Sequence, residues 1–122
     1  MQSEKFSIRS RLISFTHAFR GIRQFAWREH NARIHLVATI AVIITAIVLK
    51  VKGTEAAILA IVTGMVWIAE MINTCFEKLA DHITKEHHPE IKIIKDLAAG
   101  AVLVAAIIAV IVGLLIFIPK II

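Results

Sequence analysis

Three apolar segments, at residues 34–50, 56–79 and 97–118, constrain the fold of this 122-residue chain more than any other feature. The last has no charged residue over its 22 positions, and a helix needs about 20 apolar residues to cross a bilayer. The first contains 16 residues (34–49) without Asp, Glu, Lys or Arg, which as a helix span about 24 Å. Since 58% of the residues are hydrophobic, the sequence predicts one all-α integral membrane domain over residues 1–122, with three transmembrane helices.

Residues 6–30 precede these spans and have a different pattern, because their apolar residues recur at intervals of three and four. Such spacing places the apolar side chains on one face of a helix, and the arginines of the segment lie off that face. We therefore expect an amphipathic helix on an anionic membrane surface, and not a nucleic-acid-binding element. The apolar positions are Ile8, Leu12, Phe15, Phe19, Ile22 and Ala26.

The lysines and arginines indicate the orientation of the spans. Of the 14 in the chain, seven precede residue 34 and four lie between residues 78 and 96, which three spans place on the same side of the membrane. Because cytoplasmic loops are enriched in Lys and Arg, this side is predicted to be cytoplasmic. The remaining three are Lys50, Lys52 and Lys120.

The end of the second span carries a polar stripe formed by Glu70, Asn73, Glu77 and Asp81. At about 100° per residue, these four side chains fall on one side of a helix. A helix that simply leaves the membrane would explain Asp81 but not Glu70, which lies about 21 Å in from the Ala56 end. A charge in hydrocarbon costs about 2.5 kcal/mol or more, so Glu70 is predicted to have a function or a partner.

Further polar groups are expected at the same level of the membrane. Residues 28–33 form a polar hinge in which Glu29 either pairs with Arg33, one helical turn away, or serves as a ligand. Lys95 and Asp96 precede the third span, at the end of a polar connection expected over residues 82–96. Carboxylates such as Glu29 and Glu77 suit Mg²⁺, which is usually held by one or two carboxylates together with substrate phosphates. The pattern therefore favours phosphoryl transfer from a cytosolic nucleotide to a lipid alcohol near Glu70.

Two motifs resemble the bacterial diacylglycerol kinase family. They are Glu70-Met-Ile-Asn73-Thr-Cys-Phe-Glu77-Lys-Leu-Ala-Asp81 and, after a short gap, Lys95-Asp96-Leu-Ala-Ala-Gly-Ala-Val. Gly21, Arg23 and Glu29 upstream also match the family in order and spacing. The His87-His88-Pro89 segment and the Ile-Pro-Lys ending resemble the undecaprenol kinase branch of the family more than the branch selective for diacylglycerol.

This resemblance implies a homotrimer of three-span subunits in the bacterial inner membrane, with active sites shared between neighbouring subunits. It implies that Glu70 is the general base for the lipid hydroxyl and that Glu29 and Glu77 hold Mg²⁺ on the phosphates of ATP. Glu70 and Ala99 match lipid contacts. The positions matching nucleotide contacts are His17, Glu29, Asn73, Glu77, Asp81, Glu86, His87, His88, Lys95 and Asp96.

The chain departs from the family pattern in three places. Arg9 and Arg11 flank, without matching, an arginine that contacts ATP in relatives; His17 replaces an aromatic phenol of some members; and Cys75 replaces the usual alanine. The sequence leaves two alternatives. The acceptor is undecaprenol or diacylglycerol, and a proton- or cation-coupled transporter subunit is the alternative function, with Glu70 carrying the coupling proton.

Overall fold

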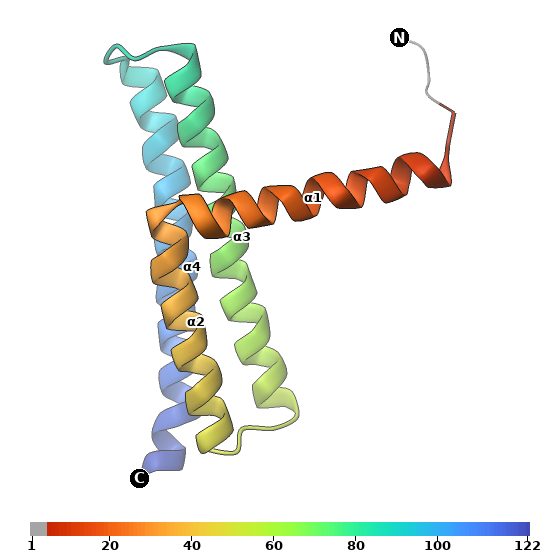
Figure 1. Cartoon of the computed structure of the whole chain (residues 1–122). Coiled ribbons are helices and arrows are strands. Elements are labelled where there is room, and N and C mark those ends of the chain that lie inside the picture. Colours follow the sequence, from red (N-terminus) through yellow and green to blue (C-terminus); the bar gives the residue numbers. More distant parts are fainter. Residues whose placement is uncertain (1–4) are drawn as a thin grey trace.

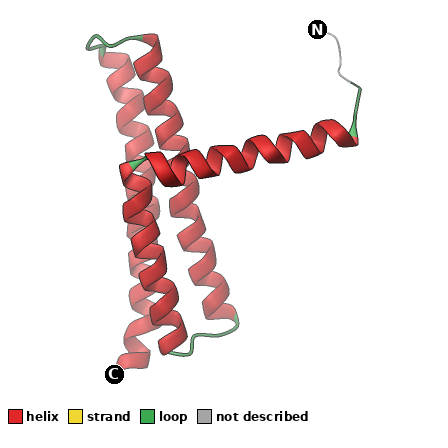
Figure 2. Ribbon diagram, in the orientation of Figure 1, coloured by secondary structure: helices red, strands yellow, loops and turns green. Residues whose placement is uncertain are grey.

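The computed structural model describes residues 5–122, and within this range the chain is entirely helical (Figures 1 and 2). The helices are α1 (Ile8–Arg28), α2 (His30–Val48), α3 (Thr54–Ile83) and α4 (Pro89–Ile121). Three of them, α2 to α4, are long and apolar enough to cross a membrane. The predicted all-α class with a preceding helix and three candidate spans is therefore confirmed, whereas the homotrimer stays a prediction.

The three candidate spans run side by side, and α1 projects sideways from them (Figure 1). The most extensive packing joins α3 to α4, while α2 lies against α3 over a shorter length. Sharp turns separate the helices. Glu29 alone, in an extended conformation (φ −91°, ψ 130°), separates α1 from α2, and Lys50 and Gly53 adopt positive φ values of 56° and 59° in the turn before α3.

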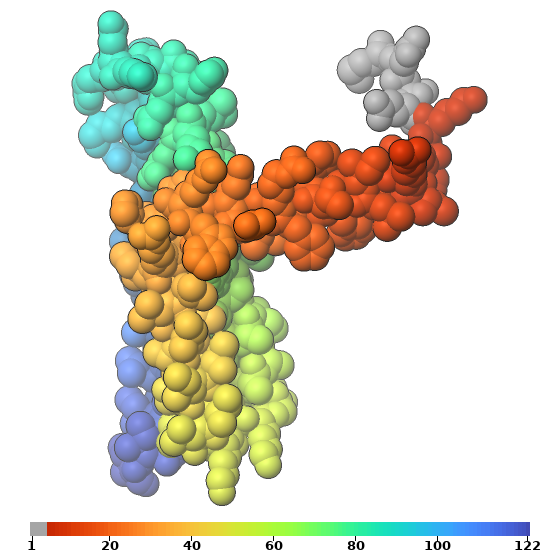
Figure 3. Space-filling model, in the orientation of Figure 1, coloured from red at the N-terminus to blue at the C-terminus, as the bar shows by residue number. Residues whose placement is uncertain are grey.

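Most of α1 stands clear of the bundle (Figure 3), and its apolar face is exposed. The helix begins after Ser7, whose hydroxyl accepts a hydrogen bond from the amide of Ser10 at 3.4 Å. Its one buried residue is Phe25, near the elbow with α2. The ring of Phe25 packs edge-on against Trp67 of α3, with centroids 5.9 Å apart. This contact anchors the C-terminal end of α1 to the bundle, and the exposed apolar face fits the expected surface helix.

Two expected irregular segments are largely helical. Residues 30–33, expected in a polar hinge, form the first turn of α2, and the connection expected over residues 82–96 is irregular only at 84–88. Pro89 stands in the first turn of α4, where a backbone N–H would have no hydrogen-bond partner within the helix, so its absence does not destabilise the helix. Lys92 and Asp96 then pair one turn apart at 2.6 Å, and Lys95 reaches Asp81 of α3 at 3.3 Å. These charges are compatible with helix because they are solvated or paired, so α3 and α4 extend beyond their apolar segments.

The end of the bundle opposite α1 is joined by a further ion pair. Lys120, in the last turn of α4, lies 2.9 Å from the carboxylate of Glu55 in the first turn of α3. Both side chains are partly exposed, so the pair contributes little to stability, about 0–1 kcal/mol. The position of the hydrocarbon along the helices, and hence the limits 34–50, 56–79 and 97–118, stays a prediction.

The early start of α4 predicts a sharp boundary in hydrogen exchange. The amide of Lys92 already donates to the carbonyl of His88 at 3.0 Å, so amides from residue 92 onwards should exchange at least about tenfold more slowly than those of residues 85–88. Hydrogen–deuterium exchange of the protein in detergent micelles, read by mass spectrometry, measures this difference. Uniformly fast exchange over residues 85–96 would contradict the helical start at Pro89.

Candidate active site

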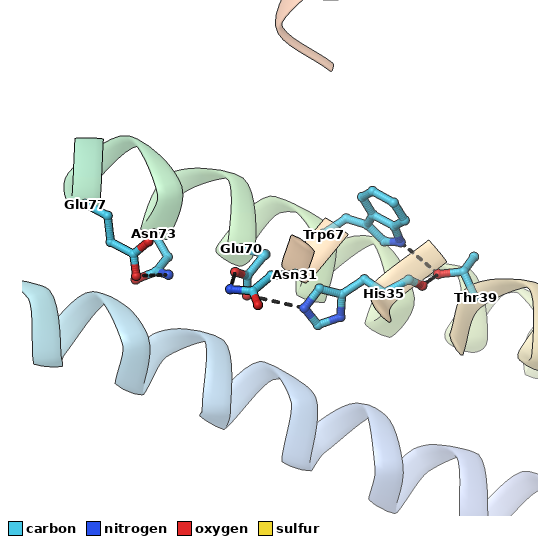
Figure 4. A network of polar contacts seen from close by, with 7 residues as sticks. All are labelled: Asn31, His35, Thr39, Trp67, Glu70, Asn73 and Glu77. Carbon is cyan, nitrogen blue, oxygen red and sulfur yellow. Dashed lines mark hydrogen bonds and ion pairs between the residues drawn. The ribbon is translucent and has the colours of Figure 1, made fainter. Parts of the chain in front are cut away.

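The side chain of Glu70 is buried between α3 and α2, with an exposed fraction of only 4%. Two residues of α2 reach its two carboxylate oxygens (Figure 4). The amide Nδ2 of Asn31 donates to Oε1 at 2.9 Å, and Nε2 of His35 lies 3.3 Å from Oε2. Because a buried polar group without a partner is costly, these contacts answer the question that the sequence raised about Glu70.

Asn31 and His35 were not among the predicted site residues. They stand four residues apart in α2, so their side chains lie one above the other on the face that meets α3. Asn31 falls within the segment predicted to be a polar hinge, and His35 is a lone histidine in an apolar segment. The i, i+4 spacing of two polar residues at the start of an apolar helix was the signal that could have found them.

Trp67 fixes the position of this part of α2. Its indole Nε1 donates to Oγ1 of Thr39 at 2.8 Å, and the Thr39 hydroxyl donates to the backbone carbonyl of His35 at 2.6 Å. The His35 and Trp67 rings are near neighbours, with centroids 6.5 Å apart. Since Trp67 also packs on Phe25, one side chain of α3 contacts both α1 and α2 at the level of Glu70.

The polar stripe of α3 becomes more exposed with each helical turn. Glu70 and Asn73 are buried at 3% and 4%, Glu77 is half-buried, and Asp81 is exposed. The amide of Asn73 donates to Oε1 of Glu77 at 3.2 Å. Its carbonyl oxygen, Oδ1, is buried and has no partner among the described residues. An oxygen acceptor therefore lies unpaired next to a carboxylate, between the buried and the exposed ends of the stripe.

Glu29 lies at the elbow between α1 and α2 and points to α3. Its carboxylate is 2.9 Å from Nζ of Lys78, and the Glu29 side chain is 27% exposed. The alternative pairing with Arg33 is not observed, because the Arg33 guanidinium donates to the backbone carbonyl of Trp27 at 3.1 Å. Glu29 is thus held at the side of α3 that carries Thr74, Cys75 and Lys78.

The other predicted site residues lie on exposed surfaces. Glu86, His87 and His88 are exposed in the loop 84–88, and Lys95 and Asp96 stand on the facing turns of α4. His17 is exposed on α1 and Ala99 on α4. Among the predicted site residues, Lys95 forms an ion pair with Asp81, and Asn73 forms a hydrogen bond with Glu77.

Oxygen donors suited to Mg²⁺ are present, but residues 5–122 of one chain do not form a complete protein cage. Within this range, no three of the His, Cys, Asp and Glu side chains are grouped to hold a metal ion. The unpaired Oδ1 of Asn73 and the carboxylates of Glu77 and Glu29 are hard oxygen donors. Asn73 and Glu77 are in contact, whereas Glu29 is paired with Lys78. The oxygens are of the type that Mg²⁺ prefers, and this ion commonly takes its remaining ligands from substrate phosphates and water.

An apolar cavity of about 340 Å³ lies between α2, α3 and α4. Its polar side chains are His35, Thr39, Thr63 and Trp67, and its remaining lining is aliphatic apart from Phe117. Because α2 and α4 run antiparallel to α3, His35, Trp67 and Ala106 mark the end of the cavity nearest Glu70, while Phe117 marks the opposite end. The cavity is thus apolar along most of its length and polar at the end nearest Glu70. A lipid with one polar group would fit such a cavity.

The fold and this site define a multi-pass helical membrane protein with a carboxylate-centred polar site next to an apolar cavity. A family model for the prokaryotic diacylglycerol kinases matches residues 16–117, and the chain belongs to that family. The predicted enzyme class, an ATP-dependent lipid kinase, is confirmed by this membership and by the relatives described next.

The chain is similar both to an undecaprenol kinase and to diacylglycerol kinases. It is 44% identical to the undecaprenol kinase of Bacillus subtilis (strain 168) over 107 residues, covering 88% of this chain and 87% of that protein. It is 40% identical to a diacylglycerol kinase of Synechocystis, covering 88% of this chain and 62% of that longer protein. A diacylglycerol kinase of Escherichia coli (strain K12) is 30% identical, covering 78% of each chain. These likenesses establish the family and leave the acceptor open.

The hydrogen bond between Trp67 and Thr39 should be measurable as a coupling between the effects of two substitutions on the free energy of unfolding. Trp67→Phe removes the donor, Thr39→Val removes the acceptor, and a cycle with the double variant should give a coupling of about 0.5–1.5 kcal/mol. Reversible unfolding in detergent micelles measures the free energies. Trp27→Phe combined with Thr39→Val is the matched control, because the Trp27 side chain is 72% exposed. A coupling no larger than that of the control pair would contradict the contact.

Proposed function

We propose that this protein transfers the γ-phosphoryl group of ATP to the hydroxyl of undecaprenol, with Mg²⁺, and so forms undecaprenyl phosphate. The observation that carries the proposal is the position of Glu70. Glu70 is only 3% exposed, and it lies between His35, which lines the apolar cavity, and a stripe that becomes more solvated toward Asp81. A reaction between a membrane alcohol and a water-soluble nucleotide needs a base at such a boundary.

Undecaprenol is the favoured acceptor for two reasons. The loop 84–88 and the residues just after it contain the His87-His88-Pro89 segment, which resembles the undecaprenol kinase branch, and the 44% identity to the Bacillus enzyme supports the same assignment. The apolar cavity also suits a hydrocarbon chain, because its lining contains only four polar side chains. Diacylglycerol would present two acyl chains and two ester groups to the same cavity, which offers few groups to receive the esters.

The metal and nucleotide would lie on the solvated side of Glu70. Glu29 and Glu77 are the proposed Mg²⁺ ligands, and Mg²⁺ would neutralise phosphate charge as the phosphoryl group transfers. Asn73 and Asp81 on α3, and Lys95 and Asp96 on α4, are proposed to contact the nucleotide, together with the loop residues Glu86, His87 and His88. The ion pair of Lys95 with Asp81 already brings α4 and α3 together there. His17 and Ala99 are further proposed contacts, for nucleotide and lipid respectively.

The proposed location is the bacterial inner membrane, with α1 and the site at the cytoplasmic face. Eleven of the 14 lysines and arginines lie on the side of α1 and of the loop 84–88, which supports this orientation by the positive-inside rule. The incomplete donor set of one chain is compatible with the homotrimer that the family resemblance implies. In that arrangement a neighbouring subunit would supply the missing contacts.

Glu70→Gln tests the proposed base most directly. The amide keeps the shape of the side chain but takes up no proton, so transfer of phosphate from ATP to undecaprenol should fall at least about 100-fold. Glu55→Gln, on the same helix but at the far end, is the matched control and should retain the wild-type rate. Near-normal transfer by Glu70→Gln would eliminate the base role.

Glu77→Gln tests the proposed metal site. Loss of one charged oxygen ligand should raise the Mg²⁺ concentration needed for half-maximal transfer by about tenfold or more. The measurement is a Mg²⁺ titration at fixed ATP, with Glu55→Gln again as the control. An unchanged Mg²⁺ dependence would show that Glu77 is not a ligand.

A further inference from the structure

His35 has no role in the function proposed so far, although it contacts both Glu70 and the apolar cavity. The His35 side chain is 19% exposed and borders the cavity, whereas Glu70 is not part of the cavity lining that the described residues form. An acceptor alcohol in this cavity would therefore meet the imidazole of His35 before it reached the carboxylate. This arrangement raises the question of how a proton passes from the acceptor to Glu70.

The contacts of the imidazole answer this question. Nε2 lies 3.3 Å from Oε2 of Glu70, and an ionised carboxylate only accepts hydrogen bonds, so Nε2 carries the hydrogen in that state. The other ring nitrogen, Nδ1, is then an acceptor, and it has no hydrogen-bond partner within residues 5–122. Because His35 lines the cavity, a hydroxyl group at that end of the cavity is a candidate donor to this nitrogen. The ring thus has a donor site facing the carboxylate and an unused acceptor site.

The surroundings of His35 favour this arrangement. Glu70 is its only ionic partner within the described residues, and the side chains that α4 contributes to the shared cavity are apolar. Asn31 holds the second carboxylate oxygen at 2.9 Å, which fixes the carboxylate relative to the ring. Thr39 and Trp67 hold the backbone of α2 at the same residue. Three side chains, those of Asn31, Thr39 and Trp67, therefore restrain one imidazole–carboxylate contact.

We propose that His35 passes the proton of the acceptor hydroxyl to Glu70. The inference rests on the proposed function and deepens it. As the hydroxyl oxygen forms its bond to the γ-phosphorus of ATP, its O–H bond breaks and the proton goes to Nδ1, while the hydrogen on Nε2 goes to Oε2 of Glu70. The bond between the γ-phosphorus and the bridging oxygen breaks, and its electron pair leaves with ADP. Glu70 then releases its proton to water. The imidazole loses the hydrogen on Nδ1 to water and takes one up at Nε2, which restores its first tautomer.

His35→Gln separates this role from simple packing, because glutamine can still hydrogen-bond to Glu70 but cannot relay a proton. We expect kcat for phosphate transfer to undecaprenol to fall about 100-fold or more, with KM for the lipid changed less than threefold. His82→Gln is the matched control, since His82 is exposed in the last turn of α3 and has no proposed role. Its kcat should equal that of the wild-type protein.

Chemical rescue gives a readout that a purely structural role would not move. His35→Ala removes the ring and leaves space beside the cavity, so added imidazole should restore at least about a tenth of the wild-type kcat in a saturable manner. Imidazole should not restore Glu70→Gln. The fluorescence of Trp67 in a Trp27→Phe background, which leaves one tryptophan, reports whether the junction around His35 is intact in each variant.

Two results would overturn the relay. One is a kcat of His35→Gln within threefold of wild type while Glu70→Gln is inactive, because Glu70 would then act on the hydroxyl directly. The other is a folded His35→Ala variant that imidazole does not rescue. If His35→Ala fails to fold, the His35→Gln result decides alone. Failure of the proposed function is a different outcome, in which the wild-type protein itself transfers no phosphate to a lipid alcohol.

Discussion

The contact of the buried Glu70 carboxylate with Asn31 and His35 joins the two helices on which the site depends. A carboxylate at this depth is tolerated only with partners, and both of its partners come from the first two turns of α2. The same turns begin directly after Glu29, so the contact also sets where α1 leaves the bundle. The positions of the surface helix, the proposed metal ligand and the proposed base are therefore linked through one buried interaction.

The stripe along α3 relates this interaction to the membrane and to the solvent. Exposure increases from Glu70 and Asn73 through Glu77 to Asp81, and the paired charges of α3 and α4 continue beyond it. A lipid alcohol approaching from the apolar cavity and a phosphate approaching from solvent would meet near His35 and Glu70. Phosphoryl transfer depends mainly on positioning and charge stabilisation. The gradient of exposure along α3 would position the lipid alcohol and the phosphate without a glycine-rich phosphate loop.

Much of this arrangement could be predicted from the sequence, because hydrophobic length and helical periodicity are local properties. They gave the three candidate spans, the amphipathic character of α1 and the polar face of α3. The pairing of Asn31 and His35 with Glu70 could not be predicted in the same way, since it depends on which face of α2 meets α3. The start of α4 at Pro89 was also missed. Polar residues there resemble a loop by composition, but the pairs Lys92–Asp96 and Lys95–Asp81 allow them to form helix.

The proposed reaction and its acceptor are tested together by comparing two lipid alcohols under matched conditions. The purified protein would be given Mg²⁺ and ATP labelled in the γ-phosphate, in micelles that contain equal mole fractions of undecaprenol or of diacylglycerol. We expect label to enter undecaprenyl phosphate faster than it enters phosphatidic acid. Faster labelling of diacylglycerol would contradict the assigned acceptor, and labelling of neither lipid would contradict the proposed reaction itself.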